Sequence, residues 1–340
     1  MPQFTLFILL FLSSQMFGQI GGLKTFQFLN LTPSARVTAL GGNLISVYDN
    51  DLSLVNQNPA LLNPEMHKQL SFNHDIYFAD ISHGYVGYAT EWDKFDANWA
   101  GGIQYIQYGS FDMTDEAGNI LGTFKAGEYA FNVAASRQIE NYSIGANVKL
   151  IYSDLGEFNA IGTAIDLGAT LIDTSNLFAA SLVIKNIGFM INQYSETSRD
   201  ELPFEIQLGF SKRLRHLPFR FSIVAHNLQK FDIRFDDPAL SQSNNIFDID
   251  TLDSGSKSFT GDKILRHFIF GGELLLSENF NVRFGYNHLR RKELMLTNGG
   301  GAAGFSVGFG VRVKKFHLSY GKAWYHYAGS TNHFGLTTKL

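Results

Sequence analysis

From Leu70 to the C-terminus the sequence repeats one pattern, in which apolar residues alternate with small or polar ones over short segments. In the segment 305–313, Phe and Val occupy every second position, and Ser, Gly and Arg occupy the positions between them. Segments 144–150 and 204–210 follow the same rule. Successive side chains of a β-strand point to opposite faces, so this period of two predicts strands with one apolar face and one polar face.

About fourteen such segments can be counted. They lie near 69–78, 83–91, 98–108, 126–137, 142–153, 161–173, 177–188, 203–213, 219–227, 266–276, 280–288, 303–313, 315–323 and 332–340. The connections after every second segment are short, whereas most of the others are long: 109–125, 189–202, 228–265 and 289–302. A soluble β-sandwich also alternates, but it has no reason to sort its connections by length. Short turns at one end and long loops at the other are typical of an outer-membrane barrel with both termini in the periplasm.

Composition and segment length agree with a membrane barrel. The chain has 33 Gly, 31 Phe and 14 Tyr, and only 17% of its residues are charged. Each segment has the length that a tilted strand needs to cross the hydrocarbon, and no later stretch approaches the ~20 apolar residues of a spanning helix. The sequence therefore predicts an all-β fold, a transmembrane antiparallel barrel closed by an even number of strands.

Several classes of function are excluded by composition. The 340 residues contain no Cys, which excludes disulfides, thiolate metal sites, a cysteine nucleophile and a lipoprotein anchor. The net charge of −4 gives no basic surface for nucleic acid.

The N-terminal part of the chain divides into two segments before the strands begin. Residues 1–18 have an apolar stretch and a small-residue end typical of a secretory signal peptide, although they contain no Lys or Arg. A buried N-terminal helix is the alternative. Residues 19–66 are expected to form a plug inside the barrel, and residues 67–340 the barrel itself. Such a plug would be a compact segment that needs a surface to pack on.

The stretch 28–64, FLNLTPSARVTALGGNLISVYDNDLSLVNQNPALLNP, is the part that does not alternate. Ser34 is placed to cap a short helix, Gly41-Gly42 to end it, and 44–48 (LISVY) looks like a strand. The order of SAR, ALGG, DND and NPALLNP resembles the N-terminal signature of FadL-like outer-membrane proteins. Within that group it is most similar to the PorV/PorQ branch of the type IX secretion system of Bacteroidetes, and to its PorQ members in particular.

The resemblance implies a FadL-like barrel and a role in protein transport at the cell surface. It implies that the partner is a PorZ-like surface protein, together with other components of the type IX attachment complex. For the plug itself, we expect Asn58, Pro59 and Ala60 to fix a turn where the plug leaves the lumen for the first strand. Proline sets φ there, and the Asn side chain can bond to nearby backbone.

Motifs of catalysis fail on their context. The run 299–304 matches GxGxxG but leads into a strand instead of a helix, and 304–308 matches GxSxG with Ser306 in the middle of a strand. His326 and His333 could meet across the last hairpin, but no metal-ligand spacing is present. We therefore expect no catalytic residue, no cofactor, no metal ligand and no enzymatic activity.

The long connection 228–265 mixes acidic and aromatic residues, and so it is the candidate docking surface, together with 189–202. Aromatic side chains would provide buried anchors and acidic ones would steer the partner. The residues singled out are Phe231, Phe235, Asp236, Asp237 and Phe247. A solvated acidic loop is the alternative, and calcium is a further one, although the spacing fits no EF-hand.

Three functions remain open at this stage. The first is a non-enzymatic component of type IX secretion that anchors a surface partner. The second is uptake of hydrophobic small molecules, as in FadL-like channels, and the third is an outer-membrane enzyme. An uptake channel should line its lumen with apolar groups, whereas the inward residues here are small or polar, which favours the first.

Overall fold

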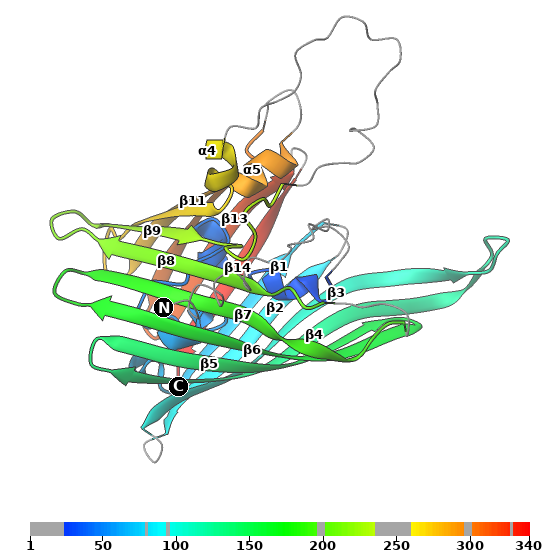
Figure 1. The fold of residues 1–340 in the computed structure, drawn as a ribbon, viewed down its shortest axis with the longest axis horizontal. Coiled ribbons are helices and arrows are strands. Elements are labelled where there is room, and N and C mark those ends of the chain that lie inside the picture. Colours follow the sequence, from blue (N-terminus) through cyan, green and yellow to red (C-terminus); the bar gives the residue numbers. More distant parts are fainter. Residues whose placement is uncertain are drawn as a thin grey trace, which may run out of the picture.

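In the computed structural model the chain forms a closed antiparallel barrel of fourteen strands (Figure 1). The structure describes residues 24–78, 81–92, 96–195, 201–234, 260–295, 301–326 and 329–340. The strands are β1 (Gln69–Ile76), β2 (Ser82–Trp92), β3 (Ala97–Thr114), β4 (Ile120–Ile139), β5 (Tyr142–Leu155), β6 (Phe158–Asp173), β7 (Phe178–Asn192), β8 (Glu205–Arg213), β9 (Phe219–Ala225), β10 (Phe268–Leu274), β11 (Phe280–Asn287), β12 (Phe305–Val313), β13 (Phe316–His326) and β14 (Gly329–Lys339). The predicted fold class and strand count are confirmed.

Closure is made by the first and last strands. β1 pairs with β14 in antiparallel register from Gln69↔Lys339 to Ile76↔Asn332, and each remaining strand pairs with its neighbours in sequence. The sheet therefore has no free edge around the barrel, as the absence of water in hydrocarbon requires. Among the helices of the described ranges, none has the length and apolar character needed to cross a membrane.

The burial pattern of the strands is the reverse of that in a soluble protein. On β5 the apolar Ile144 and Val148 are 50% and 51% exposed, whereas Ser143 and Asn147 are 1% and 2% exposed. The same inversion holds on β12, where Ser306 is buried and its Phe and Val neighbours are exposed. The apolar face therefore meets lipid and the polar face lines the lumen, as the alternation predicts.

The three longest connections, 193–204, 226–267 and 288–304, all lie on the expected side, but two predicted loops are shorter than the sequence indicated. Most of 109–125 is strand, because β3 and β4 continue as a hairpin to the turn 115–119, and β7 continues to Asn192. These residues keep pairing beyond the neighbouring strands. Because the alternation of side chains continues there, the sequence pattern does not predict where the barrel wall ends. The other two long connections each contain a short helix: α4 (Thr260–Leu265) and α5 (His288–Leu294).

The segment before β1 consists of short helical turns. They are η1 (Gln27–Asn30), α2 (Ala35–Ala39), η2 (Leu52–Leu54), η3 (Pro59–Leu61) and η4 (Pro64–Met66). The Ser34 side chain accepts a hydrogen bond from the N–H of Val37, and Gly41 and Gly42 follow with φ of 99° and 98°. The helix therefore begins and ends as predicted. Residues 44–48 form no strand, because all wall strands are already paired and the segment has no partner.

This plug touches strands on opposite sides of the lumen. α2 packs on β11 to β14, η3 packs on β4 to β6, and η2 lies against β1 and β2. Glycine permits the close approach: a Cβ on Gly145 would lie 2.5 Å from the Pro59 carbonyl carbon, and one on Gly321 would overlap the Ala35 carbonyl oxygen. The first described residue is Lys24, so the expected signal peptide lies outside the described residues.

A charged substitution tests which face of the strands meets lipid. Val148→Arg places a cation near the middle of β5, and we expect it to lower the free energy of unfolding by about 2–4 kcal/mol. Val313→Arg, at the short-turn end of β12, is the matched control and should cost about 0–1 kcal/mol. Denaturant unfolding of both variants in lipid vesicles provides the comparison. Equal costs at the two positions would contradict the assigned lipid face.

Candidate functional site

A buried ion cluster joins the plug to the barrel wall. Arg36 of α2 donates from Nε to Glu273 Oε1 at 3.0 Å, and from its terminal nitrogens to Asp49 at 2.7 Å and Asp51 at 3.0 Å. Arg36 is 4% exposed. An arginine can satisfy several carboxylates at once because its five N–H donors lie in one plane. The two aspartates are plug residues and Glu273 belongs to β10, so Arg36 connects both parts.

The wall side of the cluster is set by strand register. Glu273 lies directly opposite Arg220 on β9 and Arg283 on β11, and all three point into the lumen. Arg220 Nε donates to Glu273 Oε2 at 2.7 Å, and Arg283 Nε donates to Oε1 at 3.2 Å. Three guanidinium groups therefore surround one buried carboxylate. Removing one member of such a cluster leaves uncompensated buried charge, which typically costs about 3–5 kcal/mol.

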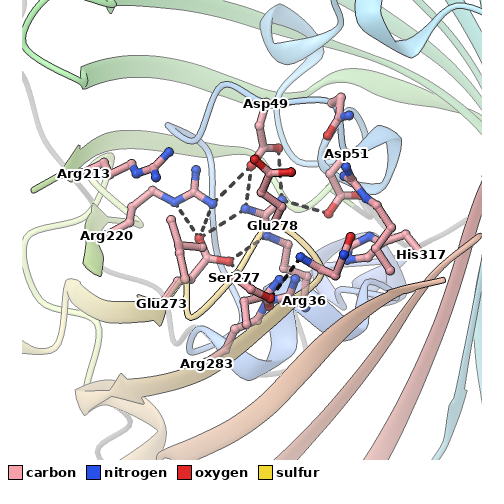
Figure 2. A pocket seen from close by; sticks show the side chains of 15 residues that line it. Arg36, Asp49, Asp51, Arg213, Arg220, Glu273, Ser277, Glu278, Arg283 and His317 are labelled. Carbon is pink, nitrogen blue, oxygen red and sulfur yellow. Dashed lines mark hydrogen bonds and ion pairs between the residues drawn. The ribbon is translucent and has the colours of Figure 1, made fainter. Parts of the chain in front are cut away.

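The cluster forms one side of a polar cavity of about 410 Å³ (Figure 2). Its other lining residues come from the ends of β8, β12 and β13 and from the turn after β10, and include Arg213, Glu278, Arg312 and His317. These strand ends all join short turns, so the cavity opens at the periplasmic end. Its charged lining suits water, ions or a polar segment of a partner, and it is unsuited to a hydrocarbon.

The predicted plug turn is well defined but lies deeper than expected. The Asn58 side chain accepts from the N–H of Ala60 at 2.9 Å and donates to the Ile45 carbonyl at 2.7 Å and to Thr170 Oγ1 at 3.0 Å. Asn58 caps η3, with Pro59 at its first position. This turn packs against β5 and β6, whereas the chain passes from the plug into the first wall strand only at Gln69, where β1 begins.

A second buried cluster lies on the strands that close the barrel. Asp75 of β1 contacts His83 Nδ1 on β2 at 2.9 Å and His333 Nδ1 on β14 at 2.7 Å, and all three are fully buried. The plug reaches it through Thr38 Oγ1, 3.2 Å from His333 Nδ1. In the described ranges no group of three or more His, Asp or Glu is arranged to hold a metal ion.

The strand register keeps apart the residue pairs that could have formed a metal site or a Ser/His catalytic pair. His333 pairs with Gly321, and His326 pairs with Gly329, so these two histidines are not neighbours. Ser306 pairs with Ala323, at the far end of the hairpin from His317, and its hydroxyl donates to the Ala39 carbonyl.

Of the predicted docking residues, only Phe231 lies in the described ranges. Its side chain is exposed, and its carbonyl oxygen lies 3.2 Å from His267 Nε2. Phe235, Asp236, Asp237 and Phe247 lie outside the described residues. This docking surface therefore stays a prediction.

Two acidic residues of the connection 228–265, Asp232 and Asp262, are held in ion pairs. Asp232 contacts Arg234 at 2.8 Å and Lys263 at 2.7 Å. Asp262 contacts Arg266 at 2.9 Å. Burial opposes the ionised form of Asp262, but hydrogen bonds from Arg266 and His288 outweigh it and hold its pKa below the ordinary value. These carboxylates tie α4 to its surroundings, so they are less available to steer a partner.

Sequence reasoning missed Arg36 and its partners as a site. A signal was present, since Arg220, Glu273 and Arg283 each occupy the inward face of an alternating strand, where charge is costly unless paired. Their mutual pairing depends on the register of β9, β10 and β11, which alternation does not fix.

A closed, lipid-facing barrel with a plug fixed in its lumen defines the class of protein: an outer-membrane β-barrel. The fold is FadL-like, as comparison with solved structures shows. The CymD monoaromatic hydrocarbon channel aligns with a TM-score of 0.56 and 11% identity, over 93% of this chain and 99% of that one. The toluene transporter TbuX of Ralstonia pickettii aligns with a TM-score of 0.50 and 11% identity, over 93% and 100%. No protein-family model and no curated protein matches the sequence.

Loss of Arg36 should release the plug. Arg36→Met keeps much of the side-chain volume but leaves Asp49, Asp51 and Glu273 without their shared partner, so we expect a loss of about 3–5 kcal/mol and protease cleavage within 24–66. The control is Arg137→Met, which removes an exposed pair with Asp96 and should cost no more than about 1 kcal/mol. Equal protease resistance of the two variants in folded barrels would contradict the role of Arg36.

Proposed function

We propose that this chain is a non-enzymatic outer-membrane barrel that anchors a surface protein instead of conducting a solute. The observation that carries the proposal is the plug, which contacts strands on opposite sides of the lumen and is fixed by the Arg36 cluster. Opening a channel would require breaking buried ion pairs, and the polar cavity beside them suits no hydrocarbon. A closed barrel still presents a large, rigid outer surface, which an anchor needs.

The resemblance to the PorV/PorQ branch makes the proposal specific: the partner would be a PorZ-like protein of the type IX attachment complex. The residues that carry the resemblance are plug residues with definite structural tasks. Arg36, Asp49 and Asp51 form the ion cluster, and Asn58 and Asn63 cap η3 and η4. The signature residues therefore explain how the plug is held in the lumen, whereas the identity of the partner rests on the resemblance alone.

Uptake of hydrophobic compounds is the second candidate, and the comparisons agree with it better than with type IX secretion, for which they offer no support. CymD is described as a monoaromatic hydrocarbon channel and TbuX as a toluene transporter. A specific feature also favours it: the long-loop end of the lumen holds an apolar cluster. Its members are Phe26, Phe28, Leu29, Ile106, Ala130, Ile151, Ala160, Ala164 and Leu202.

In this structure the plug's own side chains fill that apolar cluster. Phe26, Phe28 and Leu29 are each no more than 3% exposed and pack on β3 to β6 and on Leu202. Gln104 Nε2 on β3 also donates to the Phe28 carbonyl at 3.0 Å. A hydrocarbon could occupy the cluster only if this end of the plug moved out, so the observed arrangement favours the anchor.

Two measurements on the same preparation separate the candidates. The barrel purified in mild detergent from its native outer membrane should retain a large surface protein. The same barrel in lipid vesicles should pass labelled toluene no faster than protein-free vesicles do. Toluene flux well above that background, with no retained protein, would replace the anchor by the uptake channel.

The Arg36→Met variant provides the matched control for the flux assay. Its loosened plug should admit toluene or small ions if the barrel is otherwise open. A gain of flux in the variant, from a silent native barrel, is the expected result.

A further inference from the structure

The β3–β4 hairpin continues well past the barrel wall. The register of β2 with β3 ends at Ser82↔Gln107, and that of β5 with β4 ends at Leu155↔Ala126. β3 and β4 go on pairing to Thr114↔Ile120, so residues 108–125 form a two-stranded ribbon (Figure 1). Seven residues of strand at about 3.3 Å each carry the tip roughly 23 Å beyond the neighbouring strands. It lies on the long-loop side, outside the cell.

One face of this ribbon is apolar. Phe111 pairs with Phe124, their rings stack with centroids 5.5 Å apart, and Met113 follows on the same face. Phe111 is 43% exposed and Met113 is 39% exposed. The opposite face carries Asp112 and Thr123, which pair with each other. The two Phe rings and Met113 therefore share one face of the ribbon, and Ile120 and Leu121, each 66% exposed, lie beside the turn at its tip.

The apolar face is turned away from lipid. Phe124 precedes Ala126 and Glu128 by two and four residues, and both of these are buried in the lumen. Alternate residues of a strand share a face, so Phe124 and its partner Phe111 lie on the continuation of the lumen face, above the barrel mouth. Lipid and lipopolysaccharide surround the outer face of a barrel, so they cannot cover these side chains.

The ribbon is also held in a fixed shape. Asp115 Oδ1 accepts from the N–H groups of Ala117 and Asn119 at 2.9 and 2.8 Å, and Asp115 Oδ2 accepts from Asn119 Nδ2 at 2.8 Å. At the base, Phe124 lies against the turn at Gly156. A partner that binds a preformed element does not have to order it, whereas ordering a flexible loop costs conformational entropy and lowers affinity.

Charge narrows the partner. The ribbon carries Asp112, Asp115 and Glu116, with a single Lys125 at its base. The long connection 228–265 of the same chain carries seven Asp against four Lys or Arg, so its net charge has the same sign as that of the ribbon. A protein with lysine or arginine around an apolar patch is the complementary occupant.

We propose that the face formed by Phe111, Met113 and Phe124 is the docking face for a surface protein seated over the barrel mouth. Basic groups of that protein meet the acidic tip of the ribbon. The inference rests on the proposed anchoring function and names its site, which moves the expected docking surface from 189–202 and 228–265 to 108–125.

Photo-cross-linking in intact cells tests the face. Replacing Met113 by p-benzoylphenylalanine should give an adduct with one extracellular protein, at a segment rich in Lys or Arg. The same replacement of Thr123, on the opposite face, is the matched control and should give little. Adducts of equal yield from both positions, no adduct from Met113, an adduct within the chain's own 228–265, or an adduct with a second copy would each overturn the proposal.

An affinity measurement then distinguishes failure of the proposed docking face from failure of the proposed anchoring function. With the cross-linked protein produced and purified, the triple variant Phe111→Ala, Met113→Ala and Phe124→Ala should bind it about 30-fold more weakly or worse, the size of a hot-spot loss. Phe131→Ala, on the lipid face of β4, should bind as the native barrel does, and heat-modifiability checks folding. If the native barrel retains the partner and the triple variant binds it equally well, the site is wrong and the anchor stands. If the native barrel retains no surface protein, the anchor itself fails.

Discussion

The structure depends on one buried carboxylate, Glu273, and the three arginines around it. A sheet closed in lipid can leave no backbone group unpaired, so the wall is rigid and its lumen must be filled or wet. Here the filling is the chain's own N-terminal segment, and Arg36 connects it to Glu273 while also holding Asp49 and Asp51. A charge this deeply buried is stable only with its partners in place, so the plug and the wall depend on each other.

The barrel could be predicted from the sequence because its physics is periodic and local. Alternation of side chains, the length of a membrane crossing and the sorting of turns each leave a mark on every strand. The ends of the strands were more difficult to predict, as 109–125 shows. A ribbon that extends beyond the wall alternates just as the wall does. Its exposed Asp115–Asn119 turn and its glycines have the composition of a loop. Only the register with β2 and β5 shows where the wall stops.

The site was less predictable, since it depends on contacts between distant parts of the chain. Ser34 was predicted as a cap, and Asn58 as a turn residue that bonds to nearby backbone, because both interactions are local. The partnership of Arg36 with Glu273, 237 residues later, follows from the path of the plug through the lumen, which no local pattern encodes. Function stands one step further away, because the fold is shared with hydrocarbon channels, and the lumen contents and the outer surface must separate anchor from channel.

The central claim is that the plug closes the native barrel, and electrical recording in a planar lipid bilayer tests it most directly. The account predicts that insertion of the native protein adds no stepwise ion conductance at moderate voltage, since the plug packs on the wall and the ion cluster holds it there. Regular conductance steps of the size seen for open porin-type barrels, from protein whose plug is intact by protease digestion, would contradict the account.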